Sequence, residues 1–393
     1  MGTLLVPRER ADGETRVAVT PETVKRLAKI GWEVVVESGA GDRSHLLDAA
    51  YKDAGARVVD KAGKEDWGAA DAVAKVGPPT ENDALGGHEA DALKEGALLV
   101  GFLAPHARVD AVRKLRDGKV SALSMELVPR ITRAQSMDAL SSQASIGGYK
   151  AVLLAATHLG KYFPLLMTAA GTVQPARVVI MGAGVAGLQA IATAKRLGAI
   201  VEVSDIRPEV KEQVESLGGR FIELPMEESG SGEGGYAKEV SADFLKRQQE
   251  IVRDHVVNAD VVITTALVPG RPAPRLVTKE MVEGMRPGAV IVDMAVEQGG
   301  NCELSAKGEV TTHQGVILVG LENLPATVPS DASLLYARNV AAVLELVTKD
   351  DAVSLDLDDE IVSGALLTHQ GEVRHAPTAE KLGPSSPEGT EPS

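Results

Sequence analysis

Short apolar runs alternate with amphipathic stretches along most of the chain. In the first third, apolar runs predict strands at residues 3–6, 33–37, 57–59, 72–76, 97–103 and 120–127. Between the first two runs, Thr20 and Pro21 predict the start of a helix, because threonine caps a helix well and proline suits its first turn. Gly31 predicts where that helix ends. Strands that alternate with helices favour a parallel α/β sheet.

The same rhythm returns in the second half. An apolar, helix-periodic stretch at 143–159 predicts one long helix. Strands are then predicted at 177–181, 200–203, 220–224, 259–267, 289–294 and 316–319, with helices at 185–197, 210–217 and 279–285. This pattern predicts a complete doubly wound unit. The expected fold class is therefore α/β, with two Rossmann-like doubly wound parallel-sheet domains flanking a cleft.

Two segments interrupt the rhythm. Residues 226–235 (MEESGSGEGG) lack an apolar anchor and lie in a connection that is longer than usual, which predicts a mobile lid. The end of the chain, from Pro377 to Ser393, is rich in proline, glycine, serine and glutamate, and disorder is expected there.

Composition narrows the function classes. With 393 residues the chain can form two domains, and its net charge of −14 disfavours nonspecific binding to nucleic acid or anionic lipid. Cys302 is the only cysteine, so an intramolecular disulfide is impossible, which suits a cytosolic protein. No run of about 18 apolar residues predicts a membrane-spanning helix. The eight histidines are scattered without ligand spacing, and no metal site is expected.

A glycine-rich loop carries the strongest chemical signal. The sequence from Gly182 through Gly184 to Gly187 has the spacing G-x-G-x-x-G, follows an apolar strand and opens a helix. In such a loop the first glycine allows a tight turn, the second lets a pyrophosphate approach the backbone, and the third lets helix and strand pack closely. The helix N-terminus supplies N–H donors to the phosphates. A dinucleotide site is predicted here.

The next strand ends at an acidic residue, which bears on the choice of dinucleotide. Asp205 lies 18 positions after Gly187, where it should accept from a ribose 2′-hydroxyl and repel a 2′-phosphate, so NAD(H) is favoured over NADP(H). Arg207 leaves two alternatives open, because it could serve a phosphate or form a surface ion pair.

A second group of polar residues lies between a strand and the long helix. Arg130, Gln135, Asp138 and Ser141 belong to this stretch. A glutamine carboxamide can hold the carboxamide of a nicotinamide ring, donor to acceptor in both directions. The alternative is a solvated loop in which Asp138 or Ser141 caps the following helix.

Long runs of the sequence resemble the NAD(H)-binding domain I of proton-translocating NAD(P)+ transhydrogenases, in the form where this domain is a separate α-subunit polypeptide, within a superfamily that includes alanine dehydrogenase. The resemblance covers residues 1–375. The matching runs are 16–21, 125–138, 167–173, the glycine loop with 188–198, 234–239, 263–267 and 295–301.

The resemblance implies roles for individual residues. Gln135 would lie between two nicotinamide rings, while Arg130, Asp138 and Ser141 would orient the NAD(H) ring. The residues implied to bind the cofactor are Arg130, Ile131, Thr132, Arg133, Gln135, Gly182, Gly184, Val185, Gly187, Asp205, Ile206, Arg207, Gly235, Tyr236, Gln248 and Leu267. Tyr236 would belong to a mobile loop that closes on the nucleotide, in agreement with the lid predicted from composition.

The resemblance also implies an organisation and a reaction. We expect an N-terminal-type domain made of residues 1–140 and 330–377, an NAD(H)-binding Rossmann domain at 141–329, and a disordered tail at 378–393. The implied activity is direct hydride transfer between NAD(H) and NADP(H), coupled to proton translocation. The chain would form a homodimer and work with a membrane-spanning subunit and an NADP(H)-binding subunit, as a cytoplasmic protein held peripherally at the inner face of the cytoplasmic membrane.

Two other functions stay open. An alanine dehydrogenase-like oxidoreductase of amino or keto acids needs a cation for the carboxylate and a proton donor. That family has a lysine and a histidine for this, and their positions fall at Gly77 and near Ala104 here. Hydride transfer between two nicotinamides needs positioning rather than an acid or base, which fits their loss. The third function is a non-catalytic NAD-binding sensor, since a Rossmann fold alone does not define a reaction.

Overall fold

The structure is a computed structural model that describes residues 2–223, 242–268 and 270–382, with only the backbone given for 242–249. The chain forms two compact units. Unit 1 comprises Met1–Ser142 and Pro329–Ser393, and unit 2 comprises Gln143–Val328. Each unit is built on its own sheet.

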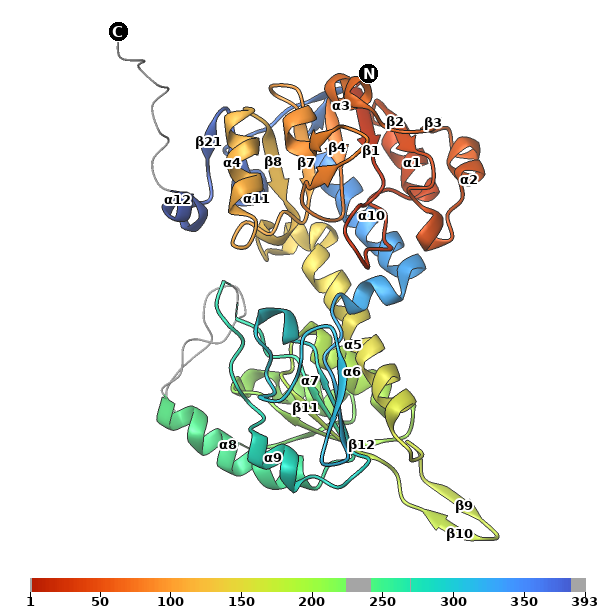
Figure 1. The fold of residues 1–393 in the computed structure, drawn as a ribbon, viewed down its shortest axis with the longest axis vertical. Coiled ribbons are helices and arrows are strands. Elements are labelled where there is room, and N and C mark those ends of the chain that lie inside the picture. Colours follow the sequence, from red (N-terminus) through yellow and green to blue (C-terminus); the bar gives the residue numbers. More distant parts are fainter. Residues whose placement is uncertain (1, 224–241, 269, 383–393) are drawn as a thin grey trace. The chain divides into compact units, whose positions relative to one another are not determined.

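The sheet of unit 1 has eight strands in the order β21-β20-β8-β7-β4-β1-β2-β3 (Figure 1). Its strands are β1 Gly2–Val6, β2 Trp32–Glu37, β3 Arg57–Val59, β4 Ala72–Ala74, β7 Leu98–Gly101, β8 Ser121–Ser124, β20 Leu366–His369 and β21 Glu372–Val373. The first six pair in parallel, whereas β20 pairs antiparallel with β8 and with β21.

Helices cover both faces of this sheet. They are α1 Pro21–Ala28, α2 Asp48–Asp53, α3 Lys64–Ala69, α4 Val109–Asp117, α10 Pro329–Leu346, α11 Glu360–Ala365 and α12 Ala376–Leu382. Leu4 and Val6 of β1 join a core with α1, α2, α10 and α11, while Leu5 joins a second core with α3 and α4. This alternation follows from the period-2 geometry of a strand. Thr20 caps α1, as the sequence predicts.

The sheet of unit 2 has seven strands in the order β13-β12-β11-β14-β15-β17-β16. Its strands are β11 Arg177–Met181, β12 Ile200–Ser204, β13 Arg220–Phe221, β14 Val261–Thr264, β15 Val290–Asp293, β16 Val310–His313 and β17 Val316–Val319. All pair in parallel except the edge strand β16. Helices α6 Val185–Arg196 and α7 Lys211–Ser216 lie on one face with α5 Ala139–His158, and α8 Ala242–Val257 and α9 Lys279–Gly284 on the other.

The two sheets share one topology. When the parallel strands are numbered in chain order, both sheets run 3-2-1-4-5-6, which is the doubly wound Rossmann order, and both add antiparallel strands at the far edge. The predicted fold class of two Rossmann-like parallel-sheet domains is confirmed. In each sheet the second and third strands extend to one side of the first strand and the later strands to the other side. The place where the strand order reverses is the topological switch point, between β1 and β4 in unit 1 and between β11 and β14 in unit 2.

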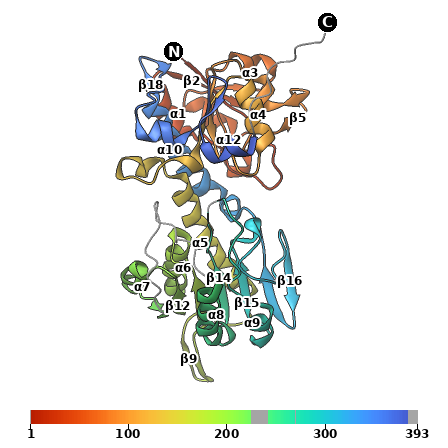
Figure 2. The same ribbon diagram turned by 90° about the vertical axis from the view of Figure 1, so that its left-hand side faces the viewer.

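Smaller elements complete the two units. Short pairs form between β5 Glu81–Asn82 and β6 Gly87–His88, and between β18 Thr348–Lys349 and β19 Ala352–Val353. In unit 2, β9 Leu166–Thr168 and β10 Gly171–Val173 form a hairpin that extends away from the sheet (Figure 2). Helix α5 begins four residues before the predicted start at 143, and α12 covers the first residues of the expected tail. The predicted lid at 226–235 lies outside the described residues.

Candidate functional site

The glycine loop joins β11 to α6, and two of its glycines are required by the protein itself. Gly182 has a φ of +105°, in the left-handed region that favours glycine. At Gly187, a Cβ atom would lie 1.9 Å from the carbonyl oxygen of Gly182. Only glycine therefore allows the start of α6 to pack on the loop, in agreement with the roles predicted for these positions.

Gly184 differs from both. Its φ is −76°, and a Cβ atom built there would meet no described atom within 4 Å. It is the N-cap of α6 and, as a glycine, has no side chain to cap this end of the helix. The first-turn N–H groups have no carbonyl partner within a helix, and they favour an anion. The space beside Gly184 therefore suits a pyrophosphate group.

Asp205 connects the glycine loop to the end of β12. Its buried carboxylate accepts from the backbone N–H of Ala183 at 2.6 Å and of Arg207 at 2.8 Å. The Arg207 guanidinium donates twice more, with both distances 3.0 Å, and this hydrogen bonding raises the pKa of Arg207. Of the two alternatives left open for Arg207, the structure shows the ion pair, with Asp205 as its partner.

A buried carboxylate that the sequence did not indicate organises the loops after β14 and β15. Asp293, the last residue of β15, is 1% exposed. It accepts from the N–H groups of Ala295 and Asn301 and from the Thr264 hydroxyl at 3.0–3.2 Å, and from the N–H of Cys302 at 2.9 Å. In the sequence, only its position at the end of a strand could have indicated this role. Its partners are backbone groups of the following loop and a side chain on another strand, and neither leaves a sequence pattern.

Asn301 also forms hydrogen bonds with the loop that follows β14. Its side chain accepts from the N–H of Ala266 at 3.1 Å and donates to the carbonyls of Ala266 and Pro274 at 2.9 and 2.8 Å. Ala266 directly precedes Leu267, a partly exposed residue predicted to line the dinucleotide. The Asp293–Asn301 pair thus fixes the backbone that presents Leu267, at the same sheet edge as the glycine loop.

The polar stretch from 130 to 141 belongs to unit 1, where it forms a short 3₁₀ helix at Thr132–Met137. Ala134 and Met137 are buried in the core, and Ile131 packs against it. The remaining side chains of this turn, including Gln135, are exposed. The apolar residues therefore anchor a turn that presents polar groups to its surroundings.

Asp138 and Ser141 bond to one another at the start of α5. The Asp138 carboxylate accepts from the backbone N–H of Ser141 at 2.8 Å and from its hydroxyl at 2.6 Å. This is the helix-capping alternative that the sequence left open. It fixes both side chains at the end of the 3₁₀ turn.

Two further contacts hold the turn in unit 1. Arg133 forms a two-pronged ion pair with Asp359 at 2.7 and 2.9 Å, and this pairing, with the N–H groups at the start of α11, lowers the pKa of Asp359 to about 2. Asn339 of α10 donates to the Ser136 carbonyl at 2.8 Å and accepts from Ser142 at 2.7 Å.

The structure thus brings the predicted site residues into two groups, one in each unit. The unit 1 group is Arg130, Ile131, Thr132, Arg133, Gln135, Asp138 and Ser141. The unit 2 group is Gly182, Gly184, Val185, Gly187, Asp205, Ile206, Arg207 and Leu267. Gly235 and Tyr236 lie outside the described residues, as does the side chain of Gln248 on α8.

Two other kinds of feature bear on the function. The described residues contain no group of three or more His, Cys, Asp or Glu side chains placed to hold a metal ion. Among the helices that the structure describes, none combines the length and the apolar character needed to cross a bilayer.

Relatives of known name match almost the whole chain. The chain is 48% identical over 376 residues to a Rhodospirillum rubrum polypeptide that forms the first portion of the NAD(P) transhydrogenase subunit alpha, with 95% of this chain and 97% of the relative covered. It is 44% identical to the transhydrogenase subunit alpha of Haemophilus influenzae, covering 93% of this chain and 70% of the relative. Identity falls to 29% with the alanine dehydrogenase of Bacillus subtilis, where coverage is 96% and 94%.

Solved structures and family descriptions agree with these matches. A transhydrogenase crystal structure from Sinorhizobium meliloti superposes with a TM-score of 0.81 at 42% identity, covering 94% of this chain and 98% of that one. An L-alanine dehydrogenase gives 0.78 at 28% identity, with 97% and 98% covered. The family descriptions "Alanine dehydrogenase/PNT, N-terminal domain" and "C-terminal domain" match residues 5–147 and 151–376. The chain therefore belongs to the alanine dehydrogenase/PNT family.

Proposed function

We propose that this chain is the NAD(H)-binding component of a proton-translocating NAD(P)+ transhydrogenase, an oxidoreductase that transfers hydride directly between NAD(H) and NADP(H). The observation that carries the proposal is the difference in identity among relatives matched over nearly the whole chain. The sequence identity is 48% with a transhydrogenase α subunit and 29% with an alanine dehydrogenase.

The residues of unit 2 fit an NAD(H) dinucleotide. The uncapped start of α6 and the open space beside Gly184 suit its pyrophosphate. Asp205 suits a ribose hydroxyl and disfavours a 2′-phosphate. Val185 and Leu267 present partly exposed apolar side chains at the same sheet edge. By family resemblance, Ile206, Gly235, Tyr236 and Gln248 complete this site.

The nicotinamide ring supplies the carbon that gives or receives the hydride. Transfer between two such rings moves no proton to oxygen or nitrogen, so this chain needs to orient a ring rather than supply an acid or base. Gln135 is exposed on the 3₁₀ turn that apolar residues, Arg133 and Asn339 hold in place. In this proposal the Gln135 carboxamide sets the position of the nicotinamide ring. The bonds between Asp138 and Ser141 fix the end of the turn that carries Gln135.

The relatives are subunits of a larger enzyme, so this chain works with partner subunits. We assign NADP(H) to a partner chain, and proton movement to a membrane-spanning subunit that holds this chain at the inner face of the cytoplasmic membrane. The proposed domains are residues 1–140 with 330–377, and residues 141–329. They have support from the two compact units.

A homodimer is the proposed assembly of this chain. Exposed apolar side chains gather around the β9–β10 hairpin, at Tyr162, Leu165, Met167 and Val173. Met167 is 78% exposed, and a two-stranded hairpin has little stability of its own in water. A second copy of the chain is the proposed cover for this hairpin.

The decisive assay compares two reactions. Reduction of an NAD analogue by NADH is measured with and without the membrane-spanning and NADP(H)-binding chains, beside reduction of NAD+ by L-alanine. We expect analogue reduction only in the reconstituted system. Turnover with alanine by this chain alone would overturn the proposal.

Gln135→Asn tests the ring-positioning role within that system. Shortening the side chain by one methylene should slow reconstituted hydride transfer about tenfold or more, with little change in NADH affinity, because small misplacements of reacting groups are costly. Ser136→Ala, at an exposed position of the same turn that is not among the implied cofactor-binding residues, is the matched control. An unchanged rate in Gln135→Asn would exclude the role.

A further inference from the structure

The sheet of unit 1 has a switch point of its own, which no predicted site residue occupies. Strand β1 pairs with β2 on one side and with β4 on the other. The strands that follow β1 in the chain are therefore added first on one side of it and then on the other. In open parallel sheets, ligands bind outside the carboxyl ends of the strands at such a point. The residues that follow β1 and β4 therefore stand where a ligand is expected.

Glu9 fills this position from the loop that follows β1. Its Oε1 accepts from the backbone N–H of Val76 at 2.5 Å, and its Oε2 accepts from that of Gly77 at 3.4 Å. The ammonium group of Lys75 lies 3.3 Å from Oε2, and the Glu9 side chain is 5% exposed. Two N–H donors and one cation at the end of β4 thus surround a single carboxylate.

The cation in this arrangement is itself fixed. The Lys75 ammonium lies 3.0 Å from Glu89, and both side chains are fully buried. Glu89 is held in turn by the side-chain amide of Asn82 at 3.1 Å and by the N–H of Thr80 at 3.2 Å. Burial would lower the pKa of Lys75, but the two carboxylates outweigh burial and raise it. The end of β4 therefore holds the groups that bind a carboxylate, two backbone N–H donors and the Lys75 ammonium, in fixed positions.

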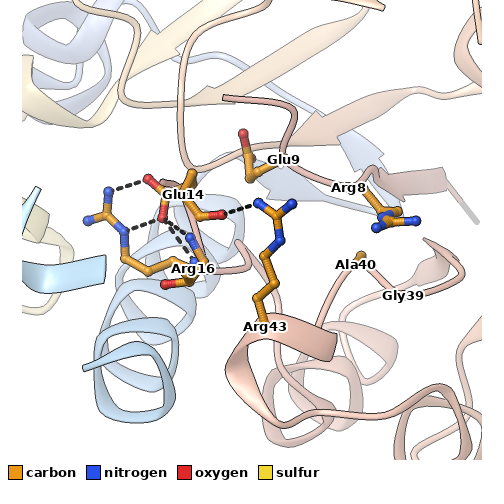
Figure 3. Close-up of a pocket in the computed structure, with 8 residues that line it drawn as sticks. Arg8, Glu9, Glu14, Arg16, Gly39, Ala40 and Arg43 are labelled. Carbon is orange, nitrogen blue, oxygen red and sulfur yellow. Dashed lines mark hydrogen bonds and ion pairs between the residues drawn. The ribbon is translucent and has the colours of Figure 1, made fainter. Parts of the chain in front are cut away.

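Glu9 is also one of the residues that line a pocket of unit 1. Glu9 lines it together with Arg8, Arg16 and Arg43 (Figure 3). Arg16 is paired with Glu14 at 2.6 Å, and Arg43 donates to the Glu14 carbonyl at 3.0 Å. Arg8 and Arg43 are exposed and, with Arg16, outnumber the two carboxylates of Glu9 and Glu14 in the lining. Removing the Glu9 side chain would therefore extend this pocket toward the donors at the end of β4.

Unit 2 shows the contrast. There the start of the helix after the first strand is open beside Gly184, with no side-chain cap. In unit 1, donors at the switch point are taken by a side chain of the same chain. The two sheets have one topology, but among the described residues the space beside Gly184 is empty, whereas Glu9 occupies the equivalent place in unit 1.

We propose that the switch point of unit 1 is a binding site for one carboxylate group, formed by the N–H groups of Val76 and Gly77 and the ammonium of Lys75, and that Glu9 is its permanent internal ligand. The site would accept a small external monocarboxylate, of the size of formate or acetate, when the Glu9 side chain is removed. The inference does not depend on the proposed enzymatic function.

Chemical rescue of Glu9→Ala tests this proposal. Removing one member of a buried ion pair should lower the thermal unfolding midpoint by roughly 5–10 °C. Sodium acetate should raise that midpoint in a saturable way, by roughly 3–5 °C at ten times its Kd, compared with sodium chloride at equal ionic strength. Wild-type protein should show no difference between acetate and chloride. Calorimetric titration with acetate should show one site in Glu9→Ala alone.

Glu89→Ala is the matched control, because it also removes a carboxylate from Lys75 but at a position that does not line the pocket. Acetate should not rescue it. If Glu9→Ala does not fold unaided, the folded yield on refolding in acetate against chloride becomes the measurement. The proposal is overturned if acetate is no better than chloride for Glu9→Ala, or if it stabilises the wild type equally.

Discussion

Two glycines of the glycine loop, Gly187 and Gly184, are expected to have different roles, one in packing and the other in ligand binding. A methyl group at Gly187 would collide with the Gly182 carbonyl, whereas a methyl group at Gly184 would enter open space. The same glycine-to-alanine change should therefore act on different properties at two positions three residues apart.

Gly187→Ala should reduce the free energy of unfolding by about 3 kcal/mol, because the backbone atoms around it must shift. Gly184→Ala should change stability by less than about 0.5 kcal/mol but weaken NADH binding at least tenfold, or about 1.4 kcal/mol, since its methyl group fills the space assigned to the pyrophosphate. Urea unfolding and calorimetric titration with NADH measure the two effects. Wild-type NADH affinity in Gly184→Ala would contradict the assigned pyrophosphate position.

At the scale of elements, the loops at the end of the unit 2 sheet depend on buried side-chain amide and carboxylate groups. Asn301→Ala removes three hydrogen bonds that hold Ala266 and Pro274. It should lower stability by about 2 kcal/mol, weaken NADH binding several-fold, and speed amide hydrogen exchange in the loop after β14. Thr278→Ala, which removes the cap of α9, is the control. Its NADH affinity should stay at the wild-type value.

The contact between the 3₁₀ turn and α11 gives a pH-dependent prediction. Arg133 and the helix N–H groups lower the pKa of Asp359 from its ordinary 3.8 to about 2. A lowered carboxyl pKa contributes stability above the unfolded-state pKa, and this stability is lost as pH falls from about 4 to about 2. Since both side chains reach solvent, the loss should be about 1 kcal/mol or less.

NMR titration of the Asp359 carboxyl provides the direct measurement. Arg133→Ala should raise its pKa toward the ordinary value, and Asp359→Asn should remove this part of the acid sensitivity. The interpretation fails if the wild-type carboxyl titrates near its ordinary pKa of 3.8.

At the scale of the whole molecule, the hairpin predicts how copies associate. Met167→Asp places a charge among exposed apolar residues and should shift the proposed dimer to monomer, raising the dimer Kd at least tenfold. Leu47→Asp is the control, because Leu47 is an exposed apolar residue too, at 62%, but belongs to unit 1 and not to the hairpin. Analytical ultracentrifugation over a concentration series distinguishes the two. A dimer of Met167→Asp as tight as the wild type would exclude the hairpin as the interface.

The fold, the glycine loop and the Asp138–Ser141 cap could be predicted because their signals are local. The glycine loop, its strand and helix, and Asp205 lie within 29 residues, from Arg177 to Asp205, and the Asp138–Ser141 cap spans four. In contrast, Glu9 and Lys75 meet because β1 pairs with β4, and Glu89 reaches Lys75 from the turn that follows β6. Asp293 and Asn301 act on Ala266 across adjacent strands. Such groups have no periodic pattern or fixed spacing, so sequence reasoning could not find them.

The hydrogen bonds of Asp205 have a consequence for how the nucleotide is chosen. An ionised carboxylate offers about four acceptor positions, and here Ala183 and Arg207 already supply four donors. A ribose hydroxyl can bond to Asp205 only by replacing one of them, so binding exchanges one hydrogen bond for another. The net gain in affinity from this contact is then small. A 2′-phosphate, however, is ionised and has no proton to offer in exchange for the donor that it displaces. In the proposed NAD(H) site, Asp205 would therefore act mainly by excluding a 2′-phosphate, and the pyrophosphate contact at α6 would supply more of the binding affinity.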